Sequence, residues 1–469
     1  MSTFRIEHDL LGEREVPAQR YYGIQTLRAL ENFHITGIPL FHYPHLIQAL
    51  AYVKKAAAQA NAQLGLLDES IAHAIVQACD EVIAGQWNTE FAVDILQGGA
   101  GTSTNMNANE VIANRALEIL GYEKGRYDII HPNTHVNMAQ STNDVFPTAL
   151  RLALYISLAG LLDSMNVLRA DFEAKAAEFA DVLKVGRTQL QDAVPITLGQ
   201  EFAAYATMLS EDIQRVEEAR SLIREINLGG TAIGTSLNAD PEYPRLATEI
   251  LRRATNIPLI LAENLVEATQ DTGAYVQLSG VLKRVAVKLS KICNDLRLMA
   301  SGPRAGLGEI NLPRMAPGSS IMPGKVNPII PEVVNQVAFQ VVGNDVAITM
   351  AAEAGQLELN VMEPVIAYNL FNSIDMLRRA ALTLAERAVR GITANAAHTR
   401  RMVEESIGLA TALNPVLGYE KASEVARLAL ESGRNVTDIV LEKGYLTPEE
   451  LTELLRPENM VRPRPLRRA

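Results

Sequence analysis

The apolar repeat of residues 278–299 limits the choice of fold more than any other feature of this chain. Apolar side chains recur there in alternating steps of four and three residues, which is a heptad pattern three repeats long. A seam of this kind lies on a helix that packs along its whole length against other helices. Its members are Leu278, Leu282, Val285, Leu289, Ile292, Leu296 and Met299.

Two other stretches carry the same periodicity. A second long helix is expected where apolar residues alternate with the charged run EDIQRVEEAR, and residues 331–390 continue in the same manner. No extended run alternates with period two, and only 5% of the residues are aromatic, so helix-on-helix packing is favoured over a sandwich or barrel. The apolar positions of the second helix are Phe202, Tyr205, Leu209, Val216 and Ile223.

These patterns predict a mainly α protein with three domains. The central domain, 145–395, is a bundle of long helices, and it follows an N-terminal domain, 1–144, made of shorter pieces and loops. A small C-terminal domain, 396–469, consists of short amphipathic helices, one of which begins at a capping box formed by Thr447 and Glu450. The basic, proline-rich end of this domain is expected to be a solvated terminus and not a nucleic-acid arm.

Charge and hydropathy exclude several classes of function. The formal net charge of −11 argues against a nucleic-acid partner, and it requires that any site for an acidic substrate be made locally positive. The most apolar run, 145–162, contains Arg151 and a proline, so it is expected to be a buried core helix and not a membrane span. Neither a nucleic acid nor a membrane is therefore predicted as a partner.

The N-terminal residues and the cysteines indicate the compartment. The stretch MSTFRIEHDLLGEREVP has no apolar segment of the kind found in a signal peptide. Cys79 and Cys293 are far apart and each lies in an apolar helical pattern, so a disulfide framework is not expected. We therefore predict a cytoplasmic protein.

Four polar segments interrupt the helical pattern just before a helix is expected to begin. They are QGGAGTSTNMNANE (97–110), QSTNDVFPTAL (140–150), GRTQLQDAVP (186–195) and GSSIMPGKVNP (318–328). Taken singly, each is explained by helix capping. Taken together, their free backbone N–H groups, hydroxyls and positive dipole ends suit an anion. Neutral donors with a single lysine favour a small dicarboxylate, because they bring no excess of buried charge.

The segment 302–331 is the most unusual, with five glycines and six prolines in thirty residues. Long irregular segments of compact domains are usually functional or disordered. The apolar residues within this one favour an ordered loop or lid, for which Gly318 and Gly324 are the expected hinges. A phosphate-binding loop is excluded, because the gap before Gly324 is one residue too long and Val326 follows Lys325.

Other types of site fit the sequence less well. The histidines form no metal-like cluster, since Pro132 argues against a continuous helix between His131 and His135. No strand precedes a glycine fingerprint, so a Rossmann site and a nucleophile elbow are excluded. The tripeptide 300–302, Ala-Ser-Gly, can cyclise to an electrophilic cofactor in other enzymes, yet its place at a helix end before a proline favours an ordinary helix stop.

Together these blocks resemble the fumarase/aspartase superfamily over almost the whole chain. Besides the four polar segments, EREVPAQRYYGIQTLRALENF, SGPRAG and AEAGQLELNVMEP match its landmarks in the same order. The resemblance implies the three-domain fold of that superfamily, in which long-helix bundles form a tetrameric helical core. It also implies a homotetramer whose active sites each combine loops of three subunits. Long helices support this expectation, since they would separate the loops of one chain by tens of ångströms.

Three details narrow the resemblance, one to the fumarase–aspartase branch of the superfamily and two to the aspartate ammonia-lyases within it. The motif GKVNP differs from that of argininosuccinate and adenylosuccinate lyases, and Gln189 stands where fumarases typically have a histidine. The residues KVNPIIPEVVNQV also differ from the fumarase pattern. The implied activity is the reversible deamination of L-aspartate to fumarate and ammonia. Fumarate hydratase is the alternative, and a non-catalytic structural homologue is less favoured because Ser319 and Lys325 are retained.

Roles for individual residues follow from the resemblance. Ser319 is implied to be the general base that removes a proton from the β-carbon to form an enediolate. Backbone amides of the Gly318 loop and the catalytic Lys325 are expected to stabilise its oxyanion, and Lys325 is also implied to hold the α-carboxylate. Because Gln189 does not titrate near neutral pH, Glu332 is expected only to position its neighbours. The other implied contacts are Thr102, Ser141, Thr142 and Ser320 with the side-chain carboxylate, Asn327 and Thr188 with the α-carboxylate, and Asn143 and Gln189, together with Thr102, with the amino group.

No cofactor is implied, because the substrate's own carboxylate accepts the electron pair. Some relatives bind an activating divalent cation, for which this sequence shows no ligand cluster. The expected partners are L-aspartate, fumarate and ammonia, together with other copies of the same chain.

Overall fold

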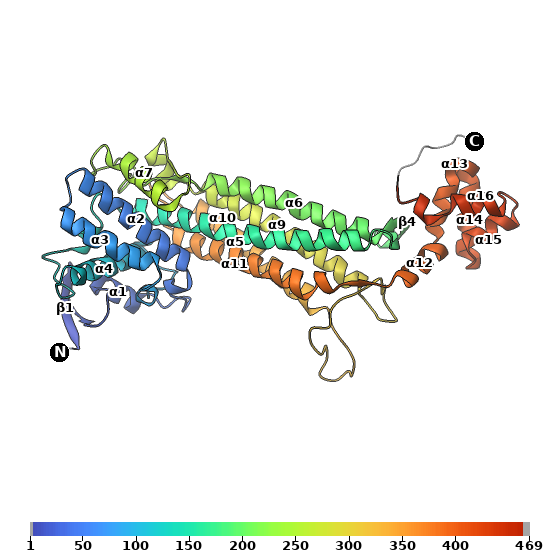
Figure 1. Ribbon diagram of the computed structural model, residues 1–469, viewed down its shortest axis with the longest axis horizontal. Coiled ribbons are helices and arrows are strands. Elements are labelled where there is room, and N and C mark those ends of the chain that lie inside the picture. Colours follow the sequence, from blue (N-terminus) through green and yellow to red (C-terminus); the bar gives the residue numbers. More distant parts are fainter. Residues whose placement is uncertain (1–2, 463–469) are drawn as a thin grey trace. The chain divides into compact units, whose positions relative to one another are not determined.

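Two compact units make up the part of the chain that the computed structural model describes, residues 3–462. Helices dominate both units (Figure 1). The predicted division into three domains stays a prediction, and residues 463–469 of the predicted basic tail lie outside the described residues. Of the described residues, unit 1 contains 3–162, 214–286 and 339–378, and unit 2 contains 163–213, 287–338 and 379–462.

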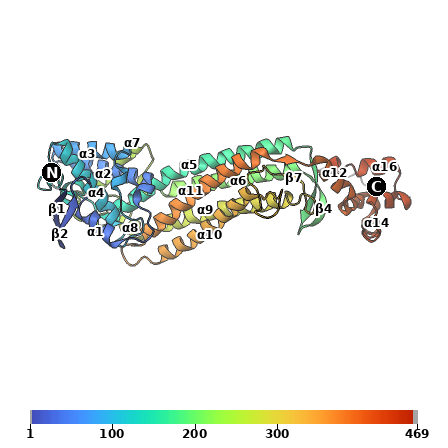
Figure 2. The ribbon, with the colours of Figure 1, turned by 90° about the horizontal axis from the view of Figure 1, so that it is seen from below.

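Five long helices run alongside one another in both ribbon views (Figures 1 and 2). Each of them contributes residues to both units. The prediction of a mainly α fold with a central bundle of long helices is therefore confirmed. The five helices are α5 (Thr142–Glu178), α6 (Leu198–Leu222), α9 (Gly273–Met299), α10 (Ile329–Glu353) and α11 (Glu363–Arg387).

The heptad seam of α9 is buried within this bundle. All seven of its residues are buried, as their periodicity predicts. Within unit 2, an aromatic cluster joins α5 to α6, since the ring of Phe172 lies 5.9 Å from that of Phe202 and 5.6 Å from that of Tyr205. The Tyr205 hydroxyl also donates to Asp295 on α9 at 3.1 Å. Apolar burial with a few satisfied polar groups therefore holds these helices together.

Helix α5 is long and apolar enough to cross a membrane by length and composition alone. In the structure, however, 72% of its most apolar window is buried inside the protein. A helix that is apolar on all sides and covered by its own chain is a core helix. This burial agrees with the prediction made from the sequence.

Short two-stranded sheets lie between the helices, and they were not predicted from the sequence. The strands have only two to seven residues, and none of them alternates regularly between buried and exposed positions, so they leave no clear period-two pattern. The segment 186–195 consequently belongs to a hairpin and is more than a polar approach to α6. The antiparallel pairs are β1 (Phe4–Asp9) with β2 (Gly12–Pro17), β3 (Leu183–Thr188) with β4 (Gln191–Thr197), and β7 (Ile310–Asn311) with β8 (Thr393–Ala394), while β5 (Glu225–Ile226) and β6 (Ile260–Leu261) are parallel.

Shorter helices of unit 1 gather around the alanine-rich helix α2 (Pro44–Gln63) (Figure 1). Small side chains on α2 allow its neighbours to approach closely, and α3, α4 and α7 all pack against it. These three helices are α3 (Glu69–Ile83), α4 (Thr102–Ile119) and α7 (Tyr243–Thr255), and unit 1 also contains α1 (Ile24–Asn32) and α8 (Leu265–Gln270).

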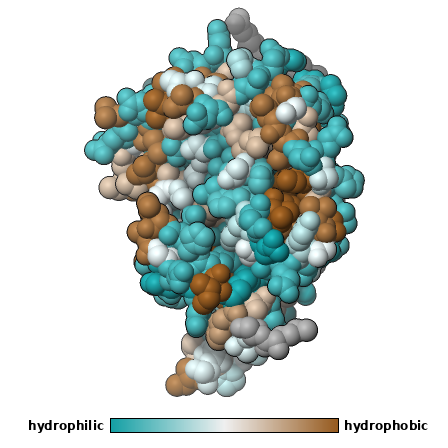
Figure 3. All heavy atoms as spheres, turned by 90° about the vertical axis from the view of Figure 1, so that its left-hand side faces the viewer, coloured by the Kyte–Doolittle hydropathy of each residue, from teal (hydrophilic) through white to brown (hydrophobic). Residues whose placement is uncertain are grey.

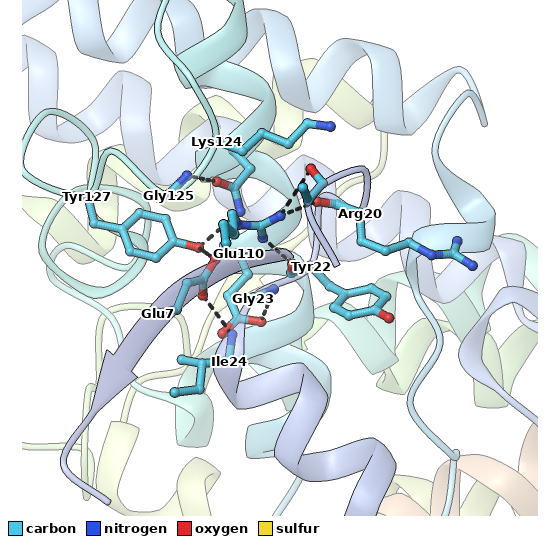
Figure 4. Close-up of polar contacts among 12 residues, drawn as sticks. Glu7, Arg20, Tyr22, Gly23, Ile24, Glu110, Lys124, Gly125 and Tyr127 are labelled. Atoms are coloured by element: carbon cyan, nitrogen blue, oxygen red, sulfur yellow. Dashed lines mark hydrogen bonds and ion pairs between the residues drawn. The ribbon is translucent and has the colours of Figure 1, made fainter. Parts of the chain in front are cut away.

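A buried carboxylate takes the place of an N-cap at the start of α1. Glu110 of α4 accepts the N–H groups of Gly23 and Gln25, each at 2.8 Å, and Glu7 of β1 accepts the N–H of Ile24 at 2.8 Å (Figure 4). A methyl group at Gly23 would lie 2.7 Å from the Glu7 carboxylate, so this close approach requires glycine. Burial raises the pKa of Glu110 to about 7. Carboxylates at a helix N-terminus are stabilised by its N–H groups and dipole.

The C-terminal helices of unit 2 enclose a small core of their own. Strand β3 contributes Leu183 and Val185 to it, which joins the β3–β4 hairpin to these helices. The predicted capping box of Thr447 and Glu450 is present and is confirmed. The helices are α12 (Ala396–Glu405), α13 (Asn414–Leu417), α14 (Tyr419–Ser432), α15 (Val436–Glu442) and α16 (Pro448–Leu454).

Two smaller predictions are also confirmed by the described residues. Cys79 and Cys293 are both free and buried, as expected without a disulfide framework. Helix α9 ends at Met299, directly before the tripeptide 300–302 that was expected to stop it. The face shown in Figure 3 is mainly hydrophilic with apolar residues in separate groups, which is normal for a folded chain.

Candidate active site

The start of α5 presents three of the residues to which the sequence pointed. Ser141 precedes the helix, and Thr142 and Asn143 begin it. The Ser141 Oγ accepts the N–H of Asn143 at 3.2 Å, while the Asp144 carboxylate accepts the N–H of Ser141 at 2.9 Å. These bonds form a capping arrangement, which explains the serine and the aspartate three residues apart.

The same turn orients its hydroxyl groups. Thr142 Oγ1 accepts a hydrogen bond from Asn105 Nδ2 at 3.1 Å, just as Ser141 Oγ accepts one from the backbone of Asn143. A hydroxyl oxygen that already accepts keeps its own proton for another partner. Ser141 and Thr142 are therefore arranged as donors, which is what a bound carboxylate requires.

Asn143 is oriented in the opposite sense. Its side-chain Nδ2 donates to the backbone carbonyl of Ala232 at 2.7 Å. The backbone carbonyl of Asn143 accepts a hydrogen bond from Asn227 Nδ2 at 3.0 Å. Because the Ala232 carbonyl can only accept a hydrogen bond, the NH₂ end of the Asn143 side-chain amide must point toward it. The Oδ1 atom is consequently the end that can accept a hydrogen bond, as an ammonium group would require.

Asp144 joins this turn to the loop that follows Asn227. Its carboxyl group is fully buried, and the oxygen that does not bind Ser141 accepts the N–H groups of Gly229 at 3.0 Å and Thr231 at 2.9 Å. Burial raises the pKa of Asp144 to about 7, and the backbone donors oppose that shift. Thr231 has a φ of 57°, so this loop holds a conformation that a threonine does not favour by itself.

A buried lysine supports the turn from within unit 1. Lys54 on α2 is fully buried, and its Nζ donates to Asn137 Oδ1 and Gln140 Oε1, each at 2.9 Å. Asn137 Oδ1 also accepts from Asn105, the residue that bonds to Thr142. Burial lowers the pKa of Lys54 to about 7, and a nearby buried carboxylate opposes that shift. The polar network thus extends from a core lysine to a hydroxyl of the turn.

Thr102 begins α4 directly after a glycine-rich turn. Gly101 has a φ of 90°, and a methyl group there would lie 2.4 Å from the ring of Phe146 on α5. Only glycine therefore lets α4 start so close to α5. The exposed Thr102 hydroxyl donates to the carbonyl of Gly99 at 2.7 Å. A role as donor to a substrate would require that this bond be exchanged.

Thr188 and Gln189 lie at the tip of the β3–β4 hairpin. Thr188 pairs with Gln191, which leaves Gln189 and Leu190 as a two-residue turn with φ angles of 54° and 63°. Positive φ at both central residues indicates a type I′ turn, for which Asn-Gly is the preferred pair. The left-handed conformation costs roughly 1–2 kcal/mol for each such residue. The strained tip exposes both Thr188 and Gln189.

The loop of residues 318–327 closes on itself. The N–H of Gly318 donates to the carbonyl of Lys325 at 2.7 Å, and Asn327 Nδ2 donates to the carbonyl of Gly318 at 2.7 Å. A methyl group at Gly318 would lie 2.7 Å from the Lys325 oxygen, so glycine is required for this approach of the two loop ends. Gly318 is therefore needed for close packing of the loop ends, which differs from the hinge role expected from the sequence. Gly324 has a φ of 80°, which suits a turn.

Two backbone amides point at the hydroxyl oxygen of Ser319. Its Oγ accepts the N–H of Met322 at 2.9 Å and that of Ile321 at 3.2 Å. Two donors directed at one oxygen stabilise negative charge there, as in an oxyanion hole. The arrangement lowers the free energy of the deprotonated hydroxyl, and an unassisted serine is a poor base.

The other predicted residues of this region are accessible. Ser320, Lys325 and Glu332 are exposed, and Asn327 is half-buried. One hydrogen of the Asn327 amide remains after its bond to the loop backbone. Glu332 lies in the first turn of α10, where a negative charge is favoured by the helix dipole.

The sequence-predicted residues thus fall into two groups, one in each unit. Within unit 1, the start of α5 brings three of them together, and Thr102 begins the neighbouring helix. Within unit 2, one pair shares the hairpin tip and the rest lie in or just after the 318–328 loop. The unit 1 group is Thr102, Ser141, Thr142 and Asn143, and the unit 2 group is Thr188, Gln189, Ser319, Ser320, Lys325, Asn327 and Glu332.

Two cavities lie outside these groups or beside them. One, of about 720 Å³ in unit 1, is lined by Arg28, Glu110 and Tyr127 among others and contains none of the predicted residues. Another, of about 280 Å³ in unit 2, is lined by both halves of the 302–331 segment, including Asn327. The hydrogen-bond donors at the start of α5 and the Ser319 hydroxyl oxygen with its two amide donors identify a reactive site better than the volume of a cavity does.

No group of three His, Cys, Asp or Glu side chains suited to a metal ion occurs among residues 3–462. His131 precedes a short helical turn at Pro132–Val136 that contains His135; His135 Nδ1 accepts the N–H of His131 at 2.9 Å, and His131 Nδ1 accepts that of Asn133 at 3.0 Å. Burial lowers the pKa of both histidines. Their ring nitrogens therefore serve the local backbone.

Three buried polar residues around the α5 turn were not predicted from the sequence to belong to the site: Lys54, Asn105 and Asp144. Lys54 does carry a signal, because it lies among apolar residues of α2, four after Leu50 and three before Ala57, on the buried face. A lysine at such a position needs polar partners. Nothing local identifies those partners, since they come from other elements.

Comparison with known proteins identifies the relatives of this chain. Residues 12–343 match a family described as "Lyase", and residues 409–462 match a family described as "Fumarase C C-terminus". The chain is 61% identical over 464 residues to an aspartate ammonia-lyase from Pseudomonas canavaninivorans, a match that covers 99% of this chain and 98% of the relative.

Solved structures share the fold. A fumarate lyase:delta crystallin from Brucella melitensis, bound to cobalt, is 58% identical with a TM-score of 0.96, and the match covers 98% of this chain and all of that one. A class II fumarase from Schistosoma mansoni is 37% identical with a TM-score of 0.94, over 98% of this chain and 99% of that one. The predicted resemblance is confirmed over nearly the full length.

Proposed function

Because this chain belongs to the lyase family that includes fumarases and aspartate ammonia-lyases, we propose that it is an aspartate ammonia-lyase. It converts L-aspartate reversibly to fumarate and ammonia. The identity of 61% to an aspartate ammonia-lyase, against 37% to a class II fumarase, favours an amine over water as the group that leaves and adds. Gln189 at the position where fumarases typically have a histidine supports the same choice.

The reaction begins with removal of a proton from the β-carbon. That proton is only weakly acidic until the adjacent carboxylate takes up the electron pair as an enediolate. Groups that bind this dianion more tightly than the ground-state carboxylate lower the barrier. We assign this stabilisation to Ser141 and Thr142, whose oxygens already accept and whose protons are left to donate. Thr102 and Ser320 complete the set of donors.

The observation that carries the proposed elimination is that two backbone N–H groups donate to the hydroxyl oxygen of Ser319. With its Oγ bound by the N–H groups of Met322 and Ile321, Ser319 is stabilised in the deprotonated form that accepts the proton. Lys325, Asn327 and Thr188 hold the α-carboxylate.

The amine then leaves as the carbon–nitrogen bond breaks and the electron pair returns to form the double bond of fumarate. Asn143 presents Oδ1 to the amino group, because its Nδ2 is bound to Ala232. Gln189 completes this contact, and Glu332 has a positioning role only. No organic cofactor takes part, since the substrate carboxylate accepts the electron pair.

Product analysis tests the function directly. The purified protein is incubated with fumarate, with and without an ammonium salt, and aspartate and malate are quantified. We expect aspartate only when ammonium is present, and no malate in either case. Malate formation without aspartate would identify a fumarate hydratase and overturn the proposal. Absence of both products would favour the non-catalytic homologue.

We also propose that the protein is a homotetramer whose active sites combine the unit 1 and unit 2 groups of different chains. Helix α10 supports this assembly, because it exposes apolar residues at spacings typical of a helix seam: Phe339, Val346 and Met350 are 68%, 55% and 67% exposed. A stripe of this kind on a long helix favours a partner helix. A cytoplasmic location and three domains divided near residues 144 and 395 belong to the same proposal.

A further inference from the structure

The β3–β4 hairpin, whose tip carries Thr188 and Gln189, is anchored at its base by a buried carboxylate. Glu309 is fully buried, and its Oε1 lies 2.6 Å from Nη1 of Arg187. Its Oε2 lies 3.4 Å from Nζ of Lys184. The two cationic side chains are themselves only 13% and 6% exposed. Moving either cation away would leave a buried charge without its partner, which is strongly unfavourable.

A β-bulge allows both cations to reach one carboxylate. In a regular strand, residues three apart face opposite sides, so Lys184 and Arg187 would diverge. The pairing register shifts across Gly186, and a methyl group there would lie 2.6 Å from the carbonyl oxygen of Val194. The glycine therefore permits a bulge, and bulges re-aim the side chains that follow them.

Glu309 itself is held by the frame of unit 2. Its N–H donates to the carbonyl of Met299 at 2.8 Å, where α9 ends. Its carbonyl accepts the N–H of Asn395 at 2.9 Å, next to the β7–β8 pair. The carboxylate is thus a fixed point between the long helix and the hairpin, at the base of the segment that carries Ser319.

Strand β4 is held separately by the C-terminal helices of unit 2. Ser406 Oγ donates to the Asp192 carboxylate at 3.0 Å. The carbonyl of Ala193 approaches Gly408 so closely that a methyl group on that glycine would lie 1.8 Å away. Contacts on both strands can therefore maintain the strained turn at the tip, since such conformations persist only where their surroundings determine them.

We propose that Glu309 is a positioning residue for the elimination reaction. By holding Arg187, it fixes the neighbouring Thr188 and the strained residue Gln189 in the geometry that meets the substrate. The inference rests on the proposed function, which gives Thr188 the α-carboxylate and Gln189 the amino group. A neutral side chain at position 309 leaves Arg187 without its counter-ion, so the guanidinium turns toward water and displaces the tip.

The test compares Glu309→Gln, which removes the charge but keeps the shape, with Glu309→Asp, which keeps the charge. The matched control is Glu442→Gln, because Glu442 is an exposed carboxylate paired with Arg434 at 2.6 Å. We expect Glu309→Gln to raise the KM for ammonium in the amination of fumarate at least tenfold, with a smaller effect on kcat. We expect Glu309→Asp to have a KM for ammonium close to that of the wild type, and the control to match the wild type.

Hydrogen exchange provides a readout that needs no substrate. In Glu309→Gln, we expect the backbone amides of residues 186–192 to exchange at least ten times faster than in the control. A lower melting temperature with unchanged KM values and unchanged exchange in the hairpin would make Glu309 a purely structural residue and overturn the proposal. If Glu309→Gln does not fold, Arg187→Lys replaces it, and an unchanged KM for ammonium in that variant overturns the proposal equally.

The same design separates this inference from the proposed function. A wild-type protein that is inactive on aspartate contradicts the function, whereas the exchange rates still decide whether Glu309 fixes the hairpin tip. An active wild type with a Glu309→Gln variant that matches the control contradicts the inference alone.

Discussion

At the scale of single residues, the donors of the α5 turn depend on groups that never touch a substrate. Asp144 is the clearest case, since its buried carboxylate accepts one N–H from the turn and two from the loop at Gly229 and Thr231. All of its visible partners are donors, which suits an ionised carboxylate. Asp144 therefore holds the backbone of Ser141 and the loop whose Ala232 carbonyl binds the amide of Asn143.

Replacing Asp144 by asparagine tests that dependence. One amide nitrogen then faces a backbone N–H, so a buried donor is left without an acceptor, and the expected loss of stability is about 1–3 kcal/mol. We also expect kcat/KM for aspartate to fall by at least tenfold. Asp240→Asn is the matched control, because Asp240 is only half-buried and its carboxylate accepts the N–H of Glu242 at 2.8 Å. Equal activity of the two variants would contradict the role of Asp144.

Ser319→Ala is the sharpest test of the proposed base. The change removes the proton acceptor but none of the groups assigned to the carboxylates, so we expect turnover to fall by more than 1,000-fold with aspartate binding largely intact. Calorimetric titration with aspartate and a coupled fumarate assay measure the two effects. Lys325→Ala should weaken binding and turnover together. Activity of Ser319→Ala near that of an exposed-serine control, Ser432→Ala, would remove Ser319 from this role.

At the scale of elements, the α9 seam shows how a local period becomes a packed interface. Leu289 is 1% exposed in the middle of that seam. Leu289→Ala should destabilise the protein by about 2–5 kcal/mol, because it removes buried apolar area and leaves a cavity. Gln277→Ala, at an exposed position of the same helix, should change stability by no more than about 0.5 kcal/mol. Urea unfolding of both variants at one protein concentration makes the comparison.

Helices α3 and α4 are joined by an ion pair that should make stability depend on pH. Arg115 contacts Glu81 through two bonds of 2.6 and 2.9 Å, and the hydrogen bond from Arg115 is the main reason that the pKa of Glu81 lies below its ordinary value of 4.5. The ionised carboxylate therefore stabilises the folded state above pH 4.5, and this contribution is lost as the pH falls through the lower folded-state pKa.

Glu81→Gln tests this expectation by differential scanning fluorimetry. The variant should melt at a lower temperature than the wild type at pH 7. The difference should shrink steadily below pH 4.5, because protonation then neutralises Glu81 in the wild type as well. A difference that stays constant down to pH 3 would show that the ion pair is not its source.

At the scale of the whole molecule, the proposed tetramer explains why site residues are divided between two units. Two inactive variants test it together: Ser319→Ala in the unit 2 group, and the double change Ser141→Ala with Thr142→Ala in the unit 1 group. If one site draws these groups from different chains, co-expression of the two variants should restore measurable activity. The particle mass by light scattering should be four times the 51.1 kDa of one chain.

Activity no greater than the sum of the separate variants would contradict shared sites, and a monomeric mass would contradict the assembly. Phe339→Glu provides a second check on the same proposal. A charge on the exposed apolar stripe of α10 should lower the particle mass, because it opposes burial of that stripe against another helix.

Sequence by itself determined the helical class, the long bundle helices and the segments that carry the candidate chemistry. These features are local: a heptad seam, a capping pair or a glycine before a helix is encoded within a few residues, so α9 and the start of α5 lie where their patterns predict. The short strands were missed because strands of two to seven residues in two-stranded pairs need no regular alternation of apolar residues.

Tertiary structure alone decided which groups support the candidate site. Lys54 reaches Asn137 across 83 positions of the chain, and Arg187 reaches Glu309 across 122. A buried charge must find its partner wherever the fold brings one, and no pattern near Lys54 or Glu309 identifies that partner. The reactive residues could therefore be named from local motifs, while the residues that orient them follow only from long-range packing.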